Sequence, residues 1–406
     1  MFGPTRTEVG ARDRLLFIFD VAEGFESELP PALRSRVSQG ARSDGWSTLF
    51  AASSEYVRRG RTLEIAGTAS SAVRYYHAID RFETSSHAAG LGFTIRLPKQ
   101  GSFRVNSTAA YSPSYLYQLF PVGTPPELGA SIPATPEYRI EEHPSYSYRT
   151  SAALSFGSRL GTMVTTSGEF SRTDLEQSTR PDHEFYDTGA TVSHAFGGGH
   201  GISAAYHYRA GRLGIGELTT EHRITFGGEV SRALSPTRRT TFRATVTPAR
   251  IDLPASVLRR RDEDASGPLY RINGEASLSY PFRVNWRVAA SYRRELEFLA
   301  VLREPVFSDG ARVELTGLLS RRLDLWALAG YATGASALVS SSDLETYTGS
   351  IKLRYAIARS LALYTQYFYY HYDLRGQAFL APELPSAFEQ HGARLGLNLF
   401  LETFNR

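Results

Sequence analysis

The sequence contains no cysteine, which excludes both a disulfide framework and a cysteine metal site. It also lacks any apolar run of the roughly 18–20 residues that a membrane-spanning helix requires. The longest apolar run near the start, at 15–19, is too short for the core of a secretory signal peptide. Either the chain is not exported or its numbering begins after a removed leader. The strand pattern described below leads us to expect the removed leader.

Lysine is nearly absent as well: of the 45 basic residues, only Lys99 and Lys352 are lysines, and the others are arginines. The formal net charge of +4 over 406 residues is too small to indicate a nucleic-acid partner. None of the 10 histidines falls in a metal-like pair with a third ligand, and no local signature of a catalytic triad is present. We therefore predict no nucleic-acid partner, no metal, no cofactor and no catalytic residue.

Residues that favour β-strands are abundant, with 23 Tyr and 23 Phe. In TYTGSIKLRYAI, at 346–357, apolar residues, tyrosines and a glycine alternate with polar residues that include Lys352 and Arg354. Successive side chains of a strand point to opposite faces, so this stretch predicts a strand with one apolar and one charged face. About eighteen segments of roughly 9–16 residues alternate in this way along the whole chain. The phase is least clear near 46–58 and 323–335.

The connections between these segments alternate between short and long. Short turns are predicted at 58–61, 98–101, 157–161, 197–201, 235–239, 281–285, 320–324 and 356–359. Long loops are predicted at about 27–44, 76–83, 119–145, 172–184, 210–219, 248–268, 301–309, 335–345 and 373–389. Together they imply an even number of antiparallel strands with both chain ends on the short-turn side. Short periplasmic turns and long extracellular loops are typical of outer-membrane β-barrels.

A soluble β-sandwich would show the same alternation, with its charged face in water and its apolar face in a core. Strand length separates the two readings, because soluble strands cluster near five or six residues whereas a tilted membrane strand needs roughly 9–11. We therefore predict an all-β fold: a closed antiparallel transmembrane β-barrel of about eighteen strands. It would occupy 13–406, after a short N-terminal segment at 1–12, in the outer membrane of a Gram-negative bacterium.

Near the end of the chain, Arg394 is followed by Gly396 and then by Leu399 and Leu401. This order of a polar residue, a glycine and alternating hydrophobic residues resembles the last-strand signal of outer-membrane β-barrel proteins. The resemblance implies that the barrel assembly machinery recognises these four residues during insertion.

The loop at 119–145 follows the fifth predicted strand and contains the run PPELG at 125–129. It resembles the constriction loop of diffusion porins, with Leu128 in the place of the usual aromatic residue. The resemblance implies that the loop folds into the pore and presents acidic residues to a basic wall; the alternative is an external loop. The candidate constriction residues are Glu127, Glu137, Glu141 and Glu142.

The charged faces of the strands would line a water-filled interior that holds more cations than acids. The predicted pore-lining residues are Arg74, Arg96, Arg104, Arg149, Arg209, Arg223, Arg243, Arg271, Glu275, Arg287, Arg312, Glu314, Lys352, Arg354 and Arg394. The architecture resembles sugar-specific porins, carboxylate-specific porins and barrels that export exopolysaccharides, and no motif distinguishes among these three classes.

The predicted function is a porin-like channel for the passive passage of hydrophilic solutes, anionic or saccharide, with polysaccharide export as one variant. The alternatives are a nonconducting barrel that acts in adhesion through its outer loops and, third, a hydrolase at the barrel rim. The predicted partners are outer-membrane lipid, lipopolysaccharide, the assembly machinery and the transported solute or polysaccharide. The sequence leaves the oligomeric state open.

Overall fold

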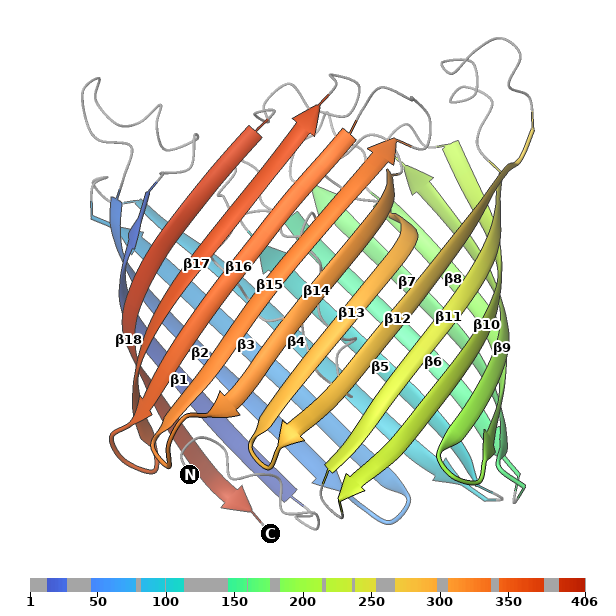
Figure 1. Ribbon diagram of the computed structural model, residues 1–406, viewed down its shortest axis with the longest axis horizontal. Helices are drawn as coiled ribbons and strands as arrows, with labels where there is room; N and C mark the ends of the chain where they lie inside the picture. The colour runs from blue at the N-terminus through green and yellow to red at the C-terminus, as the bar shows by residue number, and fades with distance from the viewer. Residues whose placement is uncertain are drawn as a thin grey trace.

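The computed structural model has eighteen antiparallel strands in one closed sheet (Figure 1). It describes residues 13–27, 45–77, 82–98, 100–112, 145–158, 160–175, 183–213, 217–235, 238–252, 267–297, 306–336, 343–375 and 387–405. Each strand pairs with its neighbours in the sequence, and β1 also pairs with β18, which closes the barrel. The predicted fold class, including the strand number, is confirmed. Among the described residues, no helix is long and apolar enough to cross a membrane.

The strands have between 12 and 19 residues, within or above the length that a tilted membrane strand requires. Their bounds are β1 (Asp13–Glu26), β2 (Gly45–Arg59), β3 (Leu63–Tyr76), β4 (Phe82–Leu97), β5 (Gly101–Ser112), β6 (Ser145–Gly157), β7 (Thr162–Leu175), β8 (His183–Phe196), β9 (His200–Leu213), β10 (Glu217–Ser235), β11 (Arg238–Asp252), β12 (Leu269–Arg283), β13 (Trp286–Glu297), β14 (Val306–Leu318), β15 (Leu323–Ser336), β16 (Asp343–Ala356), β17 (Leu361–Arg375) and β18 (Ala387–Asn405).

The connections lie alternately at the two ends of the barrel: those at one end have two to four residues, and those at the other have between 3 and 32 (Figure 1). The predicted long loop at 210–219 is wrong, because β9 ends at Leu213 and β10 begins at Glu217. All eight short turns fall where the sequence predicts them, and β1 begins and β18 ends at the same end as these turns. The turn at 197–199 requires glycine, because Gly199 has a φ of +84° and a Cβ there would lie 2.0 Å from the Ser231 carbonyl oxygen. We refer to the two ends as the short-turn end and the long-loop end.

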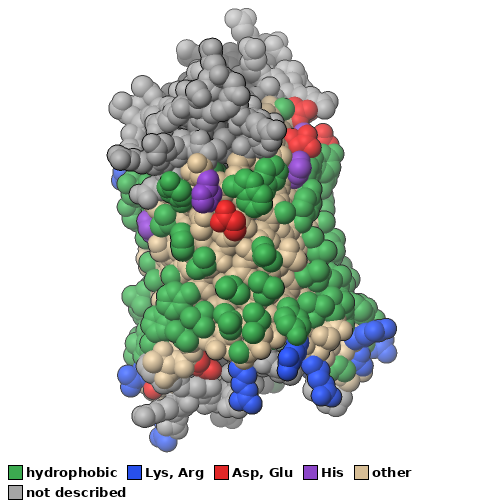
Figure 2. Space-filling view, turned by 90° about the vertical axis from the view of Figure 1, so that its left-hand side faces the viewer, with side chains coloured by type: hydrophobic (Ala, Val, Ile, Leu, Met, Phe, Trp, Pro, Cys, Tyr) green, Lys and Arg blue, Asp and Glu red, His purple; other side chains and the backbone are tan. Residues whose placement is uncertain are grey.

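The outer surface of the barrel is apolar (Figure 2). In β16, for example, Tyr347, Ile351 and Tyr355 are exposed on the outside, and Lys352 and Arg354 lie on the other face of the strand. The same alternation recurs around the wall, and large apolar side chains are exposed on nearly every strand. A surface of this kind is stable in hydrocarbon, where the closed sheet leaves no backbone edge unpaired.

Candidate functional site

The candidate functional site is the inner wall of the barrel. The strand register places all fifteen predicted pore-lining residues on inward positions, each next to an outward apolar or small residue. In β12, for example, Ile272 is 67% exposed on the outside, whereas Arg271 and Glu275 lie on the inward face. Glu275 is directly opposite Thr245 of β11 and Arg293 of β13.

One sector of the inner wall, from β16 through β18 and β1 to β4, consists mainly of buried side chains. At its centre Glu26 of β1 forms ion pairs with Arg74 of β3 and, at 3.8 Å, with Arg394 of β18. Gln390 donates a hydrogen bond to the second Glu26 oxygen at 2.8 Å. The carboxylate of Glu26 and both guanidinium groups are at most 4% exposed. One buried carboxylate therefore contacts two predicted pore-lining cations and balances the charge of one of them.

Two further acids accept hydrogen bonds from side chains of the same sector, closer to the short-turn end. Asp324 of β15 accepts hydrogen bonds from Arg354, the shortest at 2.8 Å. Asp20 of β1 accepts hydrogen bonds from Tyr364 at 2.8 Å and from Asn398 at 2.5 Å. The Lys352 ammonium lies 3.7 Å from the centre of the Tyr364 ring, within the range of a cation–π contact.

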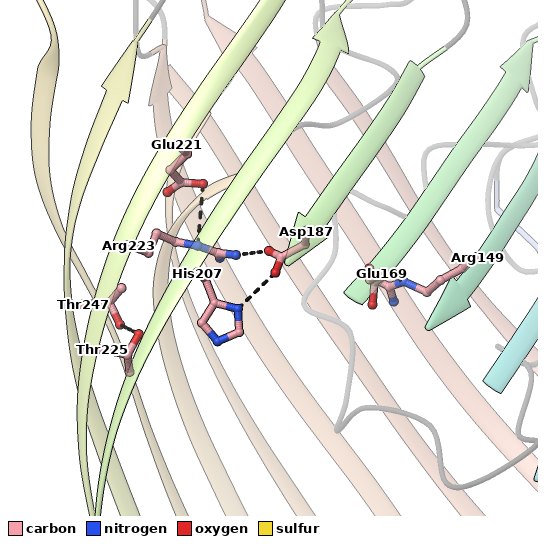
Figure 3. A network of polar contacts seen from close by, with 8 residues as sticks. All are labelled: Arg149, Glu169, Asp187, His207, Glu221, Arg223, Thr225 and Thr247. Atoms are coloured by element: carbon pink, nitrogen blue, oxygen red, sulfur yellow. Dashed lines mark hydrogen bonds and ion pairs between the residues drawn. The ribbon is translucent and has the colours of Figure 1, made fainter. Parts of the chain in front are cut away.

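A second cluster of charges lies across β8, β9 and β10 (Figure 3). Asp187 contacts Arg223 and, at 3.0 Å, the Nδ1 atom of His207. Glu221 is 2% exposed and its carboxylate lies 3.9 Å from the Arg223 guanidinium. The ring of His207 occupies the space over Gly189, where a Cβ would lie 2.4 Å from Nδ1. In this cluster two carboxylates face one guanidinium group and one histidine, so these residues add no cationic surplus to the wall.

Exposed or partly buried ion pairs continue along the rest of the inner wall. Arg149 pairs with Glu169 at 2.8 Å, and other pairs join Arg243 to Glu229 at 2.6 Å and Arg312 to Glu314 at 3.3 Å. Such pairs contribute little to stability because water screens them. Their effect on a solute is also small, since each pair is neutral overall.

The remaining predicted cations differ in their surroundings. The guanidinium groups of Arg209 and Arg271 lie 5.0 and 4.9 Å from the ring centres of Phe185 and Phe307. Arg96 donates a hydrogen bond of 3.5 Å to the Arg61 carbonyl oxygen. The side chains of Arg104 and Arg287 are exposed and form no ion pair or hydrogen bond with the described part of the chain. These two arginines, with Arg96, give the short-turn half of the inner wall its uncompensated positive charge.

The wall thus combines an apolar exterior, a polar and charged interior, full closure and an alternation of short and long connections. The architecture is that of a porin-like outer-membrane barrel. No family model matches the chain, and no curated protein matches it.

The solved structures to which the barrel is similar include two from Pseudomonas aeruginosa. OpdL is 12% identical, with a TM-score of 0.44 over 97% of this chain and 99% of that one. OccK2 (OpdF) is 9% identical, with a TM-score of 0.46 over 96% of this chain and 98% of that one. OccAB4 of Acinetobacter baumannii is 12% identical, with a TM-score of 0.44 over 98% of this chain and 100% of that one.

Sequence reasoning missed four inward groups of this porin-like barrel: Asp20, Glu26, Asp324 and His207. Alternation with an exposed neighbour marks each of them as inward, since Val21 and Phe19 flank Asp20 on the outside. The signal was therefore present in the sequence, but the first strand carries apolar residues on both faces.

The candidate constriction loop, with Glu127, Glu137, Glu141 and Glu142, lies outside the described residues, which resume at Ser145. Within the described ranges, no group of three His, Asp or Glu side chains is placed to hold a metal ion.

The four residues that resemble an assembly signal divide between the two faces of β18. Arg394 and Gly396 face inward, and Leu399 and Leu401 are on the outward face. A Cβ on Gly396 would lie 2.6 Å from the Tyr364 ring and 2.8 Å from the Cβ of Ala22. The glycine therefore has a packing role at the barrel seam in addition to any role in recognition.

We expect Gly396→Ala to destabilise the purified barrel by about 1–3 kcal/mol, because the added methyl group forces Tyr364 or β1 to move. Gly349→Ala is the matched control, since its nearest contact would be the Cβ of Tyr369 at an ordinary 4.0 Å. Unfolding in detergent, without any assembly machinery, measures the difference. Equal stability of the two variants in detergent, with a loss of Gly396→Ala insertion only in cells, would show that the glycine acts in recognition alone.

Proposed function

We propose that the protein is a passive outer-membrane channel for small hydrophilic solutes and that it favours anions. The observation that supports this best is the exposed inner surface near the short-turn end, where Arg104 and Arg287 have no anionic partner among the described residues. Most inward acids, in contrast, are partnered by arginines, as in the pairs of Glu229 with Arg243 and of Glu314 with Arg312. The net field in the lumen therefore favours negative solutes.

The mechanism follows from the width of the barrel and from its charges. Eighteen strands enclose a lumen wide enough for water and small solutes, so passage requires no conformational cycle. Exposed arginines lower the electrostatic cost of placing an anion in the lumen, and they raise that cost for a cation. The neutral pairs along the wall keep binding weak, which allows the solute to leave again.

The inward aromatic side chains of β17 favour anions over saccharides, whereas Trp326 of β15 is an inward ring that is only partly buried. Tyr364, Phe368, Tyr370 and Tyr372 of β17 all face inward, but each is at most 5% exposed. Buried rings offer no free face on which a sugar could stack. The side chains of Arg104 and Arg287 are exposed, and so they are groups that a solute in the lumen would meet.

The double variant Arg104→Glu with Arg287→Glu tests this proposal. Single-channel recordings in planar bilayers under a salt gradient should show an anion-preferring wild type, and a reversal potential that changes sign or moves strongly toward cations in the variant. The control variant Arg58→Glu with Arg294→Glu changes the net charge equally on the outward face. It should leave selectivity nearly unchanged.

Two results would contradict the proposal. A wild-type protein that is folded but conducts no current would favour the nonconducting adhesive barrel. An equal shift of the reversal potential in both double variants would show that net charge, rather than the inner wall, sets selectivity.

A further inference from the structure

The short turns themselves carry cations without acids, although acids such as Asp13 and Glu64 lie on the strands beside them. The eight short turns, at 60–62, 98–100, 158–161, 197–199, 236–237, 284–285, 319–322 and 357–360, contain no Asp or Glu. They contain Arg61, Lys99, Arg159, Arg321, Arg322 and Arg359.

Five arginines of this end, which we call the arginine collar, are exposed: Arg61, Arg283, Arg321, Arg322 and Arg359. Within the described residues, none of their side chains forms an ion pair or a hydrogen bond. Figure 2 shows Lys and Arg side chains gathered along the lower edge of the molecule, directly beneath the apolar belt. The collar therefore has charge and donors available for a partner outside the chain.

Exposed apolar side chains accompany the collar in the same turns. Val284 beside Arg283 is 69% exposed, and Leu319 and Ile357, two residues before Arg321 and Arg359, are each 51% exposed. On the outward face of the same hairpin, the rings of Phe282 and Trp286 lie 5.9 Å apart. Apolar and aromatic side chains next to arginines mark the boundary between acyl chains and headgroups, where apolar groups enter the lipid and cations meet phosphates.

We propose that the arginine collar binds the phosphate groups of anionic phospholipids in the leaflet next to the short turns. A guanidinium group donates two parallel hydrogen bonds to a phosphate, and it does so best where little water competes. An acidic soluble partner would account for the arginines but not for the exposed Val284, Leu319 and Ile357 beside them. This inference concerns the outer rim and is independent of which solute passes through the lumen.

The long-loop end does not offer the same chemistry. There, outward arginines lie next to acids: Arg250 contacts Asp252 at 3.0 Å, Arg294 is 3.8 Å from Asp309, and Arg172 pairs with Asp174. Arg58 and Arg59 are paired at the short-turn end as well, with Asp13 and Glu64, so the contrast between the two ends depends on the five collar arginines. Lipid recognition is expected where these five lie.

Quenching of Trp286 fluorescence by brominated lipids tests the proposal. Trp46 and Trp326 are replaced by phenylalanine, so that Trp286 is the tryptophan observed. The protein is reconstituted into vesicles of brominated phosphatidylcholine that contain increasing amounts of non-brominated phosphatidylglycerol. A second series uses non-brominated phosphatidylcholine and brominated phosphatidylglycerol. We expect phosphatidylglycerol to be preferred next to Trp286, and salt to weaken the preference. The triple variant Arg283→Gln, Arg321→Gln, Arg359→Gln should lose up to about fivefold in relative binding constant for each arginine removed.

The matched control is the triple variant Arg212→Gln, Arg250→Gln, Arg294→Gln, which removes three outward arginines from the long-loop end and should retain the preference. Equal quenching by the two lipids in the wild type would overturn the inference, as would the same loss in both triple variants. Saturable binding of soluble polyglutamate to the detergent-solubilised protein, lost in the collar variant while lipid preference stays, would identify an acidic soluble partner instead. A barrel that conducts no ions can still show the lipid preference. Failure of the lipid test therefore contradicts this inference alone, and failure of the conductance test contradicts the proposed function alone.

Discussion

Replacing Glu26 by glutamine is expected to destabilise the barrel by about 3–5 kcal/mol, because the change leaves two buried guanidinium groups without their carboxylate. Glu26 and Arg74 are each 1% exposed, so water cannot take over the lost interaction. Chemical unfolding of the purified protein in detergent or lipid, followed by tryptophan fluorescence, measures the change in free energy.

The matched control for Glu26→Gln is Glu229→Gln on the exposed part of the inner wall. Glu229 pairs with Arg243 at 2.6 Å, but the two side chains are 38% and 60% exposed, and an exposed pair contributes about 1 kcal/mol or less. Similar losses from the two substitutions would show that the Glu26 network is solvated and does not hold the seam sector together.

The second large effect is expected on the outer surface, where Val246→Arg should destabilise the barrel in lipid by about 2–4 kcal/mol. Val246 is 54% exposed on the outward face near the middle of β11, beside Phe226 and Gly274. A guanidinium group there would sit in hydrocarbon. Folding yield in vesicles, and unfolding by denaturant from those vesicles, give the measurement.

The neighbouring position supplies the control, because Thr245 is one residue away and faces inward opposite Glu275. Thr245→Arg should fold nearly as well as the wild type, since its guanidinium group reaches water and a carboxylate. If Val246→Arg were tolerated and Thr245→Arg disrupted folding, the assignment of inner and outer faces would be reversed. That result would also remove the basis for a membrane location.

The sequence predicted the strands and turns well because a membrane barrel is built from local patterns. Each strand must alternate, since lipid and water lie on its two sides, and TYTGSIKLRYAI shows this as Tyr347, Ile351 and Tyr355 against Lys352 and Arg354. Turn positions follow from the ends of the alternating segments. These predictions do not depend on which residues of neighbouring strands lie opposite each other. They therefore require no information about contacts between residues that are distant in the sequence.

Two of the strands were harder to read, for a reason that the structure explains. β15 places Trp326 and Leu328 on its inward face, so both of its faces contain apolar residues and the alternation weakens. β2 does the same with Leu49 and Ala51. Where the interior is packed rather than wet, the polar side of the pattern disappears.

The charge balance of the lumen could not be predicted, because it depends on pairs between strands that are distant in sequence. Tyr364 reaches Asp20 across 344 residues, and Gln390 reaches Glu26 across 364. Among the predicted cations, Arg74, Arg354 and Arg394 are partnered by acids that the sequence reading had not assigned to the interior. The surplus that remains is therefore smaller, and it is concentrated near Arg104 and Arg287.

The pairing of β1 with β18 has a consequence for biogenesis. Arg14 lies opposite Asn405, so the last ladder of hydrogen bonds joins the first strand to be synthesised to the last. A nascent or truncated chain without β18 would expose two open strand edges, which hydrocarbon cannot solvate. We therefore expect a chain that terminates before β18 to yield no inserted product.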